Sequence, residues 1–304
     1  MRRIALLLPL LALVSAPSLA AGPPTVPGAR ACPIFPANNP WNERVDRLPV
    51  APNSAAMIQA IGLDAPVHPD FGSFAGYGIP YTVVGHATAR TRVTFQYADE
   101  SDKGPYPLPA HPRVEGGGDR HVLLVDRDAC KLYELYDATR AGSAWHAGSG
   151  AIWNLRSNHL RPSGWTSADA AGLPILPGLV RYDEVAAGAI RHALRFTASR
   201  TANRFIWPAR HAAGDADPSL PPMGLRVRLK ASVDISHFGR QARVVLQALK
   251  TYGMILADNG SPWYISGASN PHFNDDDLHA LGRITGADFE VVDASPKALS
   301  AAQG

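Results

Sequence analysis

The stretch from Trp145 to Thr197 constrains the fold most, because it is rich in Gly, Trp, Arg, His and Asp and has almost no regular periodicity. It begins WHAGSGAIWNLRSNHLRPSGWTSADAAGLP and ends GLVRYDEVAAGAIRHALRFT. Backbone outside regular elements needs side chains to satisfy its polar groups, so each polar residue here should brace the chain or belong to a site. The stretch therefore predicts an irregular centre and the location of a candidate site.

The N-terminus has the pattern of a secretory signal. Arg2 and Arg3 precede an apolar run, and Ser18-Leu19-Ala20 is a small-x-small cleavage site. Residues 1–20 are therefore predicted to be a signal peptide, and the mature protein to be secreted or periplasmic. The run is short for a bilayer span and no later stretch is longer, so no stable membrane insertion is expected. An uncleaved N-terminal anchor is the alternative.

The net charge of the protein indicates which class of partner it can bind. The chain has a formal net charge of +3, and removal of two arginines with the signal peptide lowers it to +1. A nearly neutral protein lacks the positive charge that nucleic-acid binding requires, so no nucleic-acid partner is expected.

The chain has two cysteines, Cys32 and Cys130. An oxidising compartment favours one disulfide between them, which would hold the N-terminal arm to the middle of the fold. Two free thiols are the alternative. No CxxC or CxH spacing occurs, so no metal site is expected at the cysteines.

The hydrophobic pattern predicts a mainly β protein with a β-sandwich or jelly-roll-like core and a few peripheral α-helices. Residues 21–53 are expected to form a linker or arm, 54–296 a single β-rich domain and 297–304 a flexible tail. Helices are expected at 54–61, 239–252 and 275–281. The expected strands are 81–85, 91–97, 121–126, 131–136, 192–197, 204–207, 225–230, 254–257, 263–266 and 289–292.

Two of these strands carry charged side chains on a defined face. Glu134 lies on a strand with large apolar groups on both faces, next to the continuously apolar strand 121–126. This pattern makes it the best candidate for a carboxylate withdrawn from water. Arg226, Arg228 and Lys230 share one face of another strand and are expected to be solvated.

Any catalytic site must be assembled from residues that lie far apart in the sequence. The sequence has no GxSxG, Walker, GxGxxG or HExxH motif, and its histidines show no metal-ligand spacing. No metal is therefore predicted, and the cofactor stays open. The pool of Glu, Asp, His, Arg and Tyr is typical of enzymes that act on sugars.

Two reaction schemes for cleaving a glycan fit these residue types. Hydrolysis needs two carboxylates, for which Glu134 and Glu184 are candidates. Elimination needs a base such as Tyr133 or His146, with an arginine or asparagine to neutralise the sugar acid. The predicted catalytic residues are Glu134, His146 and Glu184. The predicted substrate-binding residues are Trp145, Trp153, Arg156, Asn158, His159, Trp165 and His192.

Each candidate also has a structural interpretation. Asp183 could cap a helix in which Glu184 is a first-turn charge, and His192 could be a core histidine. Asp169 is expected to brace a short helix. The tryptophans could belong to the core.

Three segments resemble a group of secreted bacterial proteins of uncharacterised function: WHAGSGAIWNLRSN, RPSGWTSADAAGLPILPGLVRYDEV and ALKTYGMILADNG. The resemblance covers nearly the whole mature chain and implies one integral domain, but no activity. Residue types and export predict an enzyme that acts on a carbohydrate polymer, a glycoside hydrolase ahead of a lyase. The alternatives are a non-catalytic glycan- or surface-binding protein and an envelope protein without a small ligand.

Overall fold

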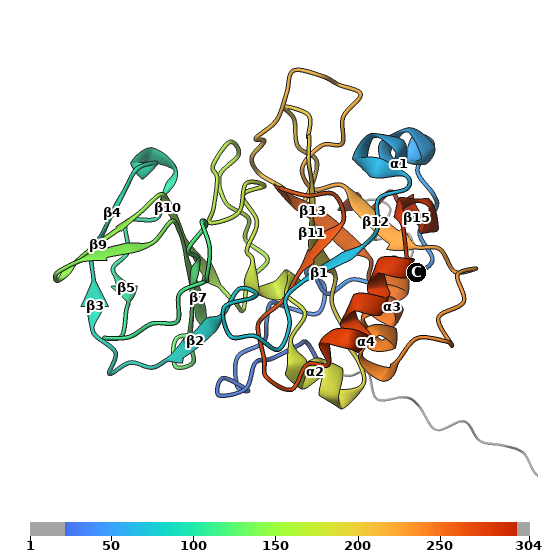
Figure 1. Cartoon of the computed structure of the whole chain (residues 1–304). Helices are drawn as coiled ribbons and strands as arrows, with labels where there is room; N and C mark the ends of the chain where they lie inside the picture. Colours follow the sequence, from blue (N-terminus) through green and yellow to red (C-terminus); the bar gives the residue numbers. More distant parts are fainter. Residues whose placement is uncertain (1–21, 297–304) are drawn as a thin grey trace, which may run out of the picture.

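The fold is mainly β, with 25% strand and 17% helix, which confirms the predicted class. A computed structural model describes residues 22–296, so the predicted signal peptide and the predicted tail lie outside the described residues. A six-stranded sheet has the order β1-β14-β11-β13-β12-β15, and a four-stranded sheet the order β10-β7-β6-β2. The two sheets occupy opposite sides of the molecule in Figure 1. No described helix is both long and apolar enough for a bilayer.

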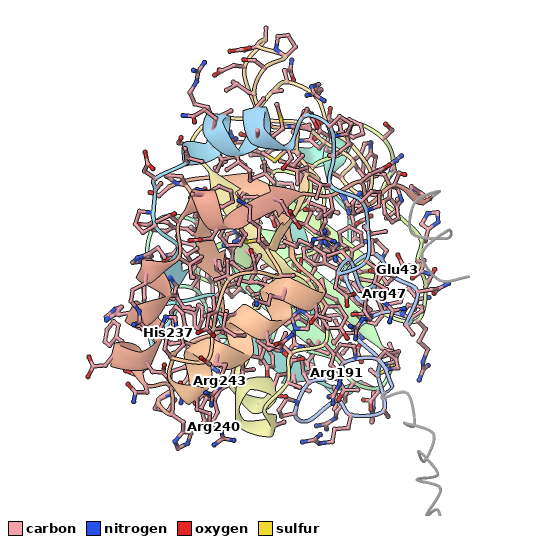
Figure 2. The ribbon with its side chains drawn as sticks, turned by 90° about the vertical axis from the view of Figure 1, so that its right-hand side faces the viewer. Glu43, Arg47, Arg191, His237, Arg240 and Arg243 are labelled. Atoms are coloured by element: carbon pink, nitrogen blue, oxygen red, sulfur yellow. A yellow bond between two sulfur atoms is a disulfide. The ribbon has the colours of Figure 1, made fainter. Side chains whose placement is uncertain are left out.

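The six-stranded sheet is mixed. β11 pairs in parallel with β13 and β1 in parallel with β14, whereas β12 runs antiparallel to both β13 and β15. Helices α3 and α4 lie beside this sheet (Figure 1), and Figure 2 shows Arg240 and Arg243 on the exposed side of α3. The strands are β1 His68–Asp70, β11 Leu194–Ala198, β12 Arg226–Leu229, β13 Met254–Asn259, β14 Tyr264–Ser266 and β15 Phe289–Val291. The helices are α1 Ser54–Gly62, α2 Tyr182–Ala187, α3 Arg240–Thr251 and α4 Asp275–His279, with short 3-10 turns at Ala98–Glu100, Leu176–Gly178, Ala280–Arg283 and Gly286–Asp288.

The four-stranded sheet contains the predicted hairpin. β6 and β7 are antiparallel, with Leu123 opposite Glu134. The strands are β2 Tyr81–Val84, β6 Val122–Asp126, β7 Lys131–Tyr136 and β10 Ser149–Asn154. Two small sheets flank it, formed by β3 Arg90–Thr91 and β5 Tyr106–Pro107, and by β4 Val93–Phe95, β8 Thr139–Ala141 and β9 Ala144–Ala147.

One apolar core joins the two large sheets. It contains Leu123 and Leu132 from the hairpin together with Leu194 and Ile255 from the six-stranded sheet, all fully buried. A second cluster covers the other face of the hairpin and includes Trp145. The sheets therefore share buried surface, while the sandwich or jelly-roll topology stays a prediction.

The arginine row of β12 corrects one prediction. Arg226 is buried, with 3% of its surface exposed, and Arg228 is half-buried in an ion pair with Glu290. Both guanidinium groups donate hydrogen bonds to backbone carbonyls, those of Pro40, Glu43 and Tyr252 for Arg226 and those of Val45 and Leu48 for Arg228. The expected solvated face is wrong for these two arginines, because the N-terminal arm lies over it.

Cys32 and Cys130 form the predicted disulfide and are both buried. The bridge closes a loop of 98 residues. Replacing both cysteines with alanine is expected to lower the free energy of unfolding by about 4 kcal/mol, because the unfolded chain gains the entropy of that loop. Urea unfolding of the mature protein and the double variant measures this loss. Two titratable thiols in the denatured, non-reduced protein would contradict the bridge.

Candidate functional site

A cleft of about 430 Å³ opens where β13, β7 and the irregular stretch meet. Its volume lies in the range of small-ligand sites. Its lining is largely polar and includes four carboxylate residues. The lining residues are Tyr97, Glu100, Asp119, Tyr136, Ser149, Thr166, Ser167, Ala168, Asp169, Ala170, His211, Ala213, Asp258 and Asn259.

Asp169 reaches the cleft floor from a tight turn. The Ser167 hydroxyl accepts a hydrogen bond from the Asp169 amide at 2.9 Å, and the Gly172 amide donates to the Asp169 carbonyl at 3.0 Å. Gly172 has φ +67, and a Cβ there would lie 2.5 Å from the Trp165 carbonyl oxygen, so only glycine fits. The expected short helix at Asp169 is wrong, because this turn replaces it.

Asp258 comes from β13, 89 positions further along the chain. The pairing of β11 with β13 shifts between Phe196 and Thr197, so Ala257 is an extra residue in β13. Such a bulge redirects the following side chain. The side chain of Asp258 keeps 25% of its surface exposed, and one carboxylate oxygen accepts the Asn259 amide at 2.8 Å.

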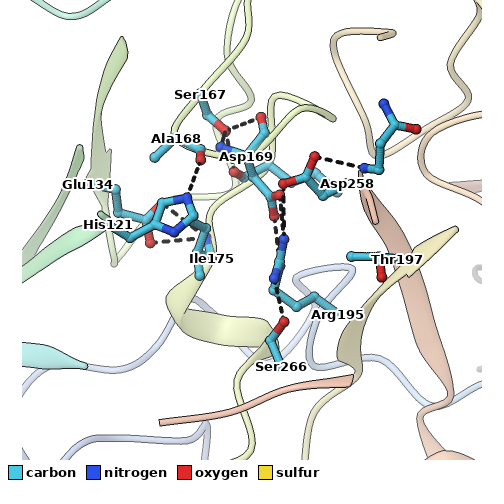
Figure 3. A network of polar contacts seen from close by, with 12 residues as sticks. His121, Glu134, Ser167, Ala168, Asp169, Ile175, Arg195, Thr197, Asp258 and Ser266 are labelled. Carbon is cyan, nitrogen blue, oxygen red and sulfur yellow. Dashed lines mark hydrogen bonds and ion pairs between the residues drawn. The ribbon is translucent and has the colours of Figure 1, made fainter. Parts of the chain in front are cut away.

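Arg195 joins the two carboxylates (Figure 3). Its Nε and one terminal nitrogen donate to the two oxygens of Asp169 at 3.0 and 2.7 Å, and that terminal nitrogen also lies 3.4 Å from Asp258. Its other terminal nitrogen donates to the Ser266 hydroxyl. Burial alone would lower the pKa of Arg195, but the Asp169 carboxylate outweighs it and the pKa is raised. Arg195 therefore holds the Asp169 side chain in a bidentate, charge-assisted contact.

Asp258 is the carboxyl group whose pKa is raised. Burial, and then the neighbouring Asp169 carboxylate, raise its pKa well above the ordinary value, with Arg195 acting in the opposite sense. Arg195 contacts Asp169 with two hydrogen bonds but Asp258 with only one, at 3.4 Å, so it offsets the burial of Asp258 only in part. Asp258 therefore presents to the cleft a carboxyl group whose protonated form is favoured.

Glu100 and His211 lie in the same lining. Glu100 accepts the Thr166 amide at 3.0 Å and lies 3.9 Å from the His211 ring, whose other nitrogen is 2.7 Å from the Ala170 carbonyl. Glu100 keeps 33% of its side chain exposed. It supplies a second accessible carboxylate to the cleft lining.

Glu134 lies outside this lining. It is fully buried, and the amides of Ile175 and Leu176 donate to its carboxylate at 2.9–3.0 Å. Burial raises its pKa to about 7. The predicted withdrawal from water is present, but the carboxyl group faces backbone rather than the cleft.

Glu184 and His192 form a separate buried cluster with Arg181. Glu184 lies 2.7 Å from Arg181 and 3.0 Å from His192. Burial would raise the pKa of Glu184, but Arg181 and His192 together outweigh it and the pKa is lowered. Arg181, not Asp183, occupies the N-cap of α2, so the expected cap is wrong. This cluster is not among the residues that line the cleft.

The remaining candidates are dispersed. His146 is exposed on β9, with its Nδ1 2.5 Å from the Thr94 hydroxyl. Asn158 is exposed and donates to the N-terminal arm at Asn38. Arg156 and His159 are also exposed, Trp165 is half-buried, and Trp145 and Trp153 are buried. None of these is among the described lining residues of the cleft.

Sequence reasoning missed Asp258 and gave Asp169 a bracing role. The signal in the sequence is weak, because Asp169 lies in an irregular turn and Asp258 lies near the end of β13, and the two segments meet only through the folded backbone. In residues 22–296 no group of His, Cys, Asp and Glu could hold a metal ion. The resemblance to secreted bacterial proteins stays a prediction. Comparison of the chain with protein-family models, curated proteins and solved structures finds no match.

Proposed function

We propose that the protein is an exported glycoside hydrolase that cleaves a carbohydrate polymer, with Asp258 as the general acid. The observation that carries the proposal is the Asp258 carboxyl group, which faces the 430 Å³ cleft with a raised pKa. Glycosidic bonds need a proton on the leaving oxygen, and a carboxyl group with a raised pKa supplies it near neutrality.

The proposed reaction uses two carboxyl groups of the cleft lining, Asp258 and Glu100. Asp258 donates its proton to the glycosidic oxygen while the bond from that oxygen to the anomeric carbon breaks. The resulting Asp258 carboxylate is stabilised by the Asn259 amide and by Arg195. A water molecule adds to the anomeric carbon and gives its proton to Glu100. Water is consumed, one glycosidic bond is lost and two hydroxyl groups form.

The cleft charges favour hydrolysis of an uncharged glycan over elimination from an acidic one. The acidic side chains in the lining are Glu100, Asp119, Asp169 and Asp258, next to His211. Elimination needs a cation to neutralise the sugar acid. Arg195 lies beneath the floor with its donors engaged by Asp169 and Ser266. Carboxylate walls repel an acidic sugar, so we expect a neutral substrate.

Asp258→Asn is expected to lower turnover by about 100- to 10,000-fold, because the amide cannot donate the proton of a carboxylic acid. Release of reducing ends is measured with soluble neutral polymers: carboxyl-free β-1,3-, β-1,4- and α-1,4-glucans and water-soluble chitin. In the wild type, kcat/KM should fall as pH rises through the raised pKa of Asp258. Asp234→Asn, at an exposed aspartate outside the cleft lining, is the matched control and should keep wild-type activity.

Two outcomes would contradict the proposal. Retention of a polymer by the wild type without any reducing ends would favour a glycan-binding protein. Equal turnover by Asp258→Asn and the wild type would remove Asp258 from the reaction. Thermal unfolding of both variants shows that each is folded.

A further inference from the structure

A second pocket of about 320 Å³ adjoins the cleft. Each of three chain segments lines both hollows with consecutive residues. Gln96, Asp137 and Gly148 line the second pocket. Their chain neighbours Tyr97, Tyr136 and Ser149 line the cleft. The two hollows are therefore neighbouring parts of one surface depression.

The boundary between the hollows is a hydrogen-bonded backbone. The Tyr97 amide donates to the Gly148 carbonyl at 2.9 Å, and the Gly148 amide donates to the Tyr136 carbonyl at 2.8 Å. A Cβ at Gly148 would lie 2.6 Å from the Tyr136 ring. Glycine thus lets the three segments pack closely at the boundary, with Tyr97 and Tyr136 on its cleft side.

The second pocket presents groups that bind sugar hydroxyls. Gln96, Asp137, Thr139 and His146 are all exposed there. The Thr94 hydroxyl holds Nδ1 of the His146 ring, which fixes the ring with Nε2 on its opposite edge. Asp137 has φ +47, a left-handed conformation that aspartate tolerates better than most residues. These side chains supply amide, carboxylate, hydroxyl and imidazole groups on one small surface.

We propose that this second pocket is a distal sugar subsite, in which Gln96 and His146 bind an uncharged sugar unit of a chain whose cleaved bond lies at Asp258. The inference rests on the proposed function and extends it to the substrate class: a polymer or long oligosaccharide rather than a disaccharide. Two tyrosines lie on the path of the sugar polymer from one hollow to the other. They are Tyr97, with 46% of its surface exposed, and half-buried Tyr136. Tyrosine rings are surfaces on which sugar rings stack.

The test uses binding, so that it does not depend on turnover. Asp258→Asn serves as the parent protein, and disaccharides and hexasaccharides of β-1,4-N-acetylglucosamine, β-1,4-glucose, β-1,3-glucose and α-1,4-glucose are titrated by calorimetry. His146→Ala and Gln96→Ala are expected to raise the Kd of the bound hexasaccharide about tenfold each and to leave the disaccharide unchanged. His86→Ala is the matched control, because His86 is also exposed and also makes one side-chain hydrogen bond, to Asp128.

The outcomes separate the two proposals. Hexasaccharide binding that depends on His146 in a protein whose wild type cleaves nothing would support the subsite and overturn the hydrolase. Cleavage of a polymer with equal Kd values in the His146, Gln96 and His86 variants would overturn the subsite and leave the hydrolase standing. Failure of all of these oligosaccharides to bind the parent protein would also overturn the subsite.

Discussion

Replacing Arg195 with methionine is expected to lower the free energy of unfolding by about 3–5 kcal/mol, because it leaves a buried carboxylate without its partner. The Asp169 side chain is 0% exposed, and Arg195 is its bidentate donor. Methionine fills part of the volume but supplies no charge. Urea unfolding at pH 7 measures the loss.

A double-mutant cycle separates the ion pair from the loss of packing. Asp169→Asn removes the charge that Arg195 neutralises, so Asp169→Asn/Arg195→Met should be more stable than the sum of the single variants predicts. Arg200→Met is the control, because Arg200 and Asp215 form an exposed pair at 3.0 Å, with 60% and 55% of their side chains accessible. That change should cost less than about 1 kcal/mol. A cost for Arg195→Met no larger than this would show that Asp169 is not a buried anion.

Local patterns in the sequence were enough to predict much of the architecture. Continuous apolar residues in β6 and alternation in β7 predicted the hairpin, and the helical spacing of Ala242, Val245 and Leu249 predicted α3. The expectation of an oxidising compartment predicted the disulfide. In each case the pattern lies within a few residues, or depends only on the compartment.

The cleft depends on longer-range features that no such pattern contains. The strand at 254–257 was expected to end before Asp258, whereas β13 continues to Asn259 through the bulge at Ala257. The bulge depends on the pairing with β11, so it appears only once both strands are placed. Alternation likewise placed Arg226 and Arg228 on one face but could not show that the N-terminal arm covers it.

Glu134 is expected to make the protein less stable as the pH rises from about 4.5 to about 7. Burial raises its pKa in the folded protein from 4.5 to about 7. Within this window the unfolded chain loses the proton while the folded protein keeps it, so ionisation favours unfolding. Below the window both states are protonated, and above it both are ionised, so the penalty stays constant. At 1.36 kcal/mol per pKa unit, the total is about 3 kcal/mol.

Glu134→Gln isolates this contribution because glutamine cannot ionise. The amides of Ile175 and Leu176 both lie within 3.0 Å of the same carboxylate oxygen, which the glutamine carbonyl can replace. The glutamine amide lies where the second oxygen was, near the Ile175 amide, and any cost of that contact is independent of pH. The difference in unfolding free energy between Glu134→Gln and the wild type should therefore shift by about 3 kcal/mol in favour of the variant from pH 4.5 to pH 8.

Glu134→Ala distinguishes the charge from the hydrogen bonds. Alanine leaves the amides of Ile175 and Leu176 buried without an acceptor and creates a cavity, so we expect a loss of about 3 kcal/mol or more at pH 4.5, where the wild-type carboxyl is neutral. At pH 8 the loss should be smaller, because the wild type then carries the ionisation penalty and alanine does not. Urea unfolding at both pH values gives the two differences. Parallel stability curves for the wild type, Glu134→Gln and Glu134→Ala would show that Glu134 titrates at its ordinary pKa and is not sealed from water.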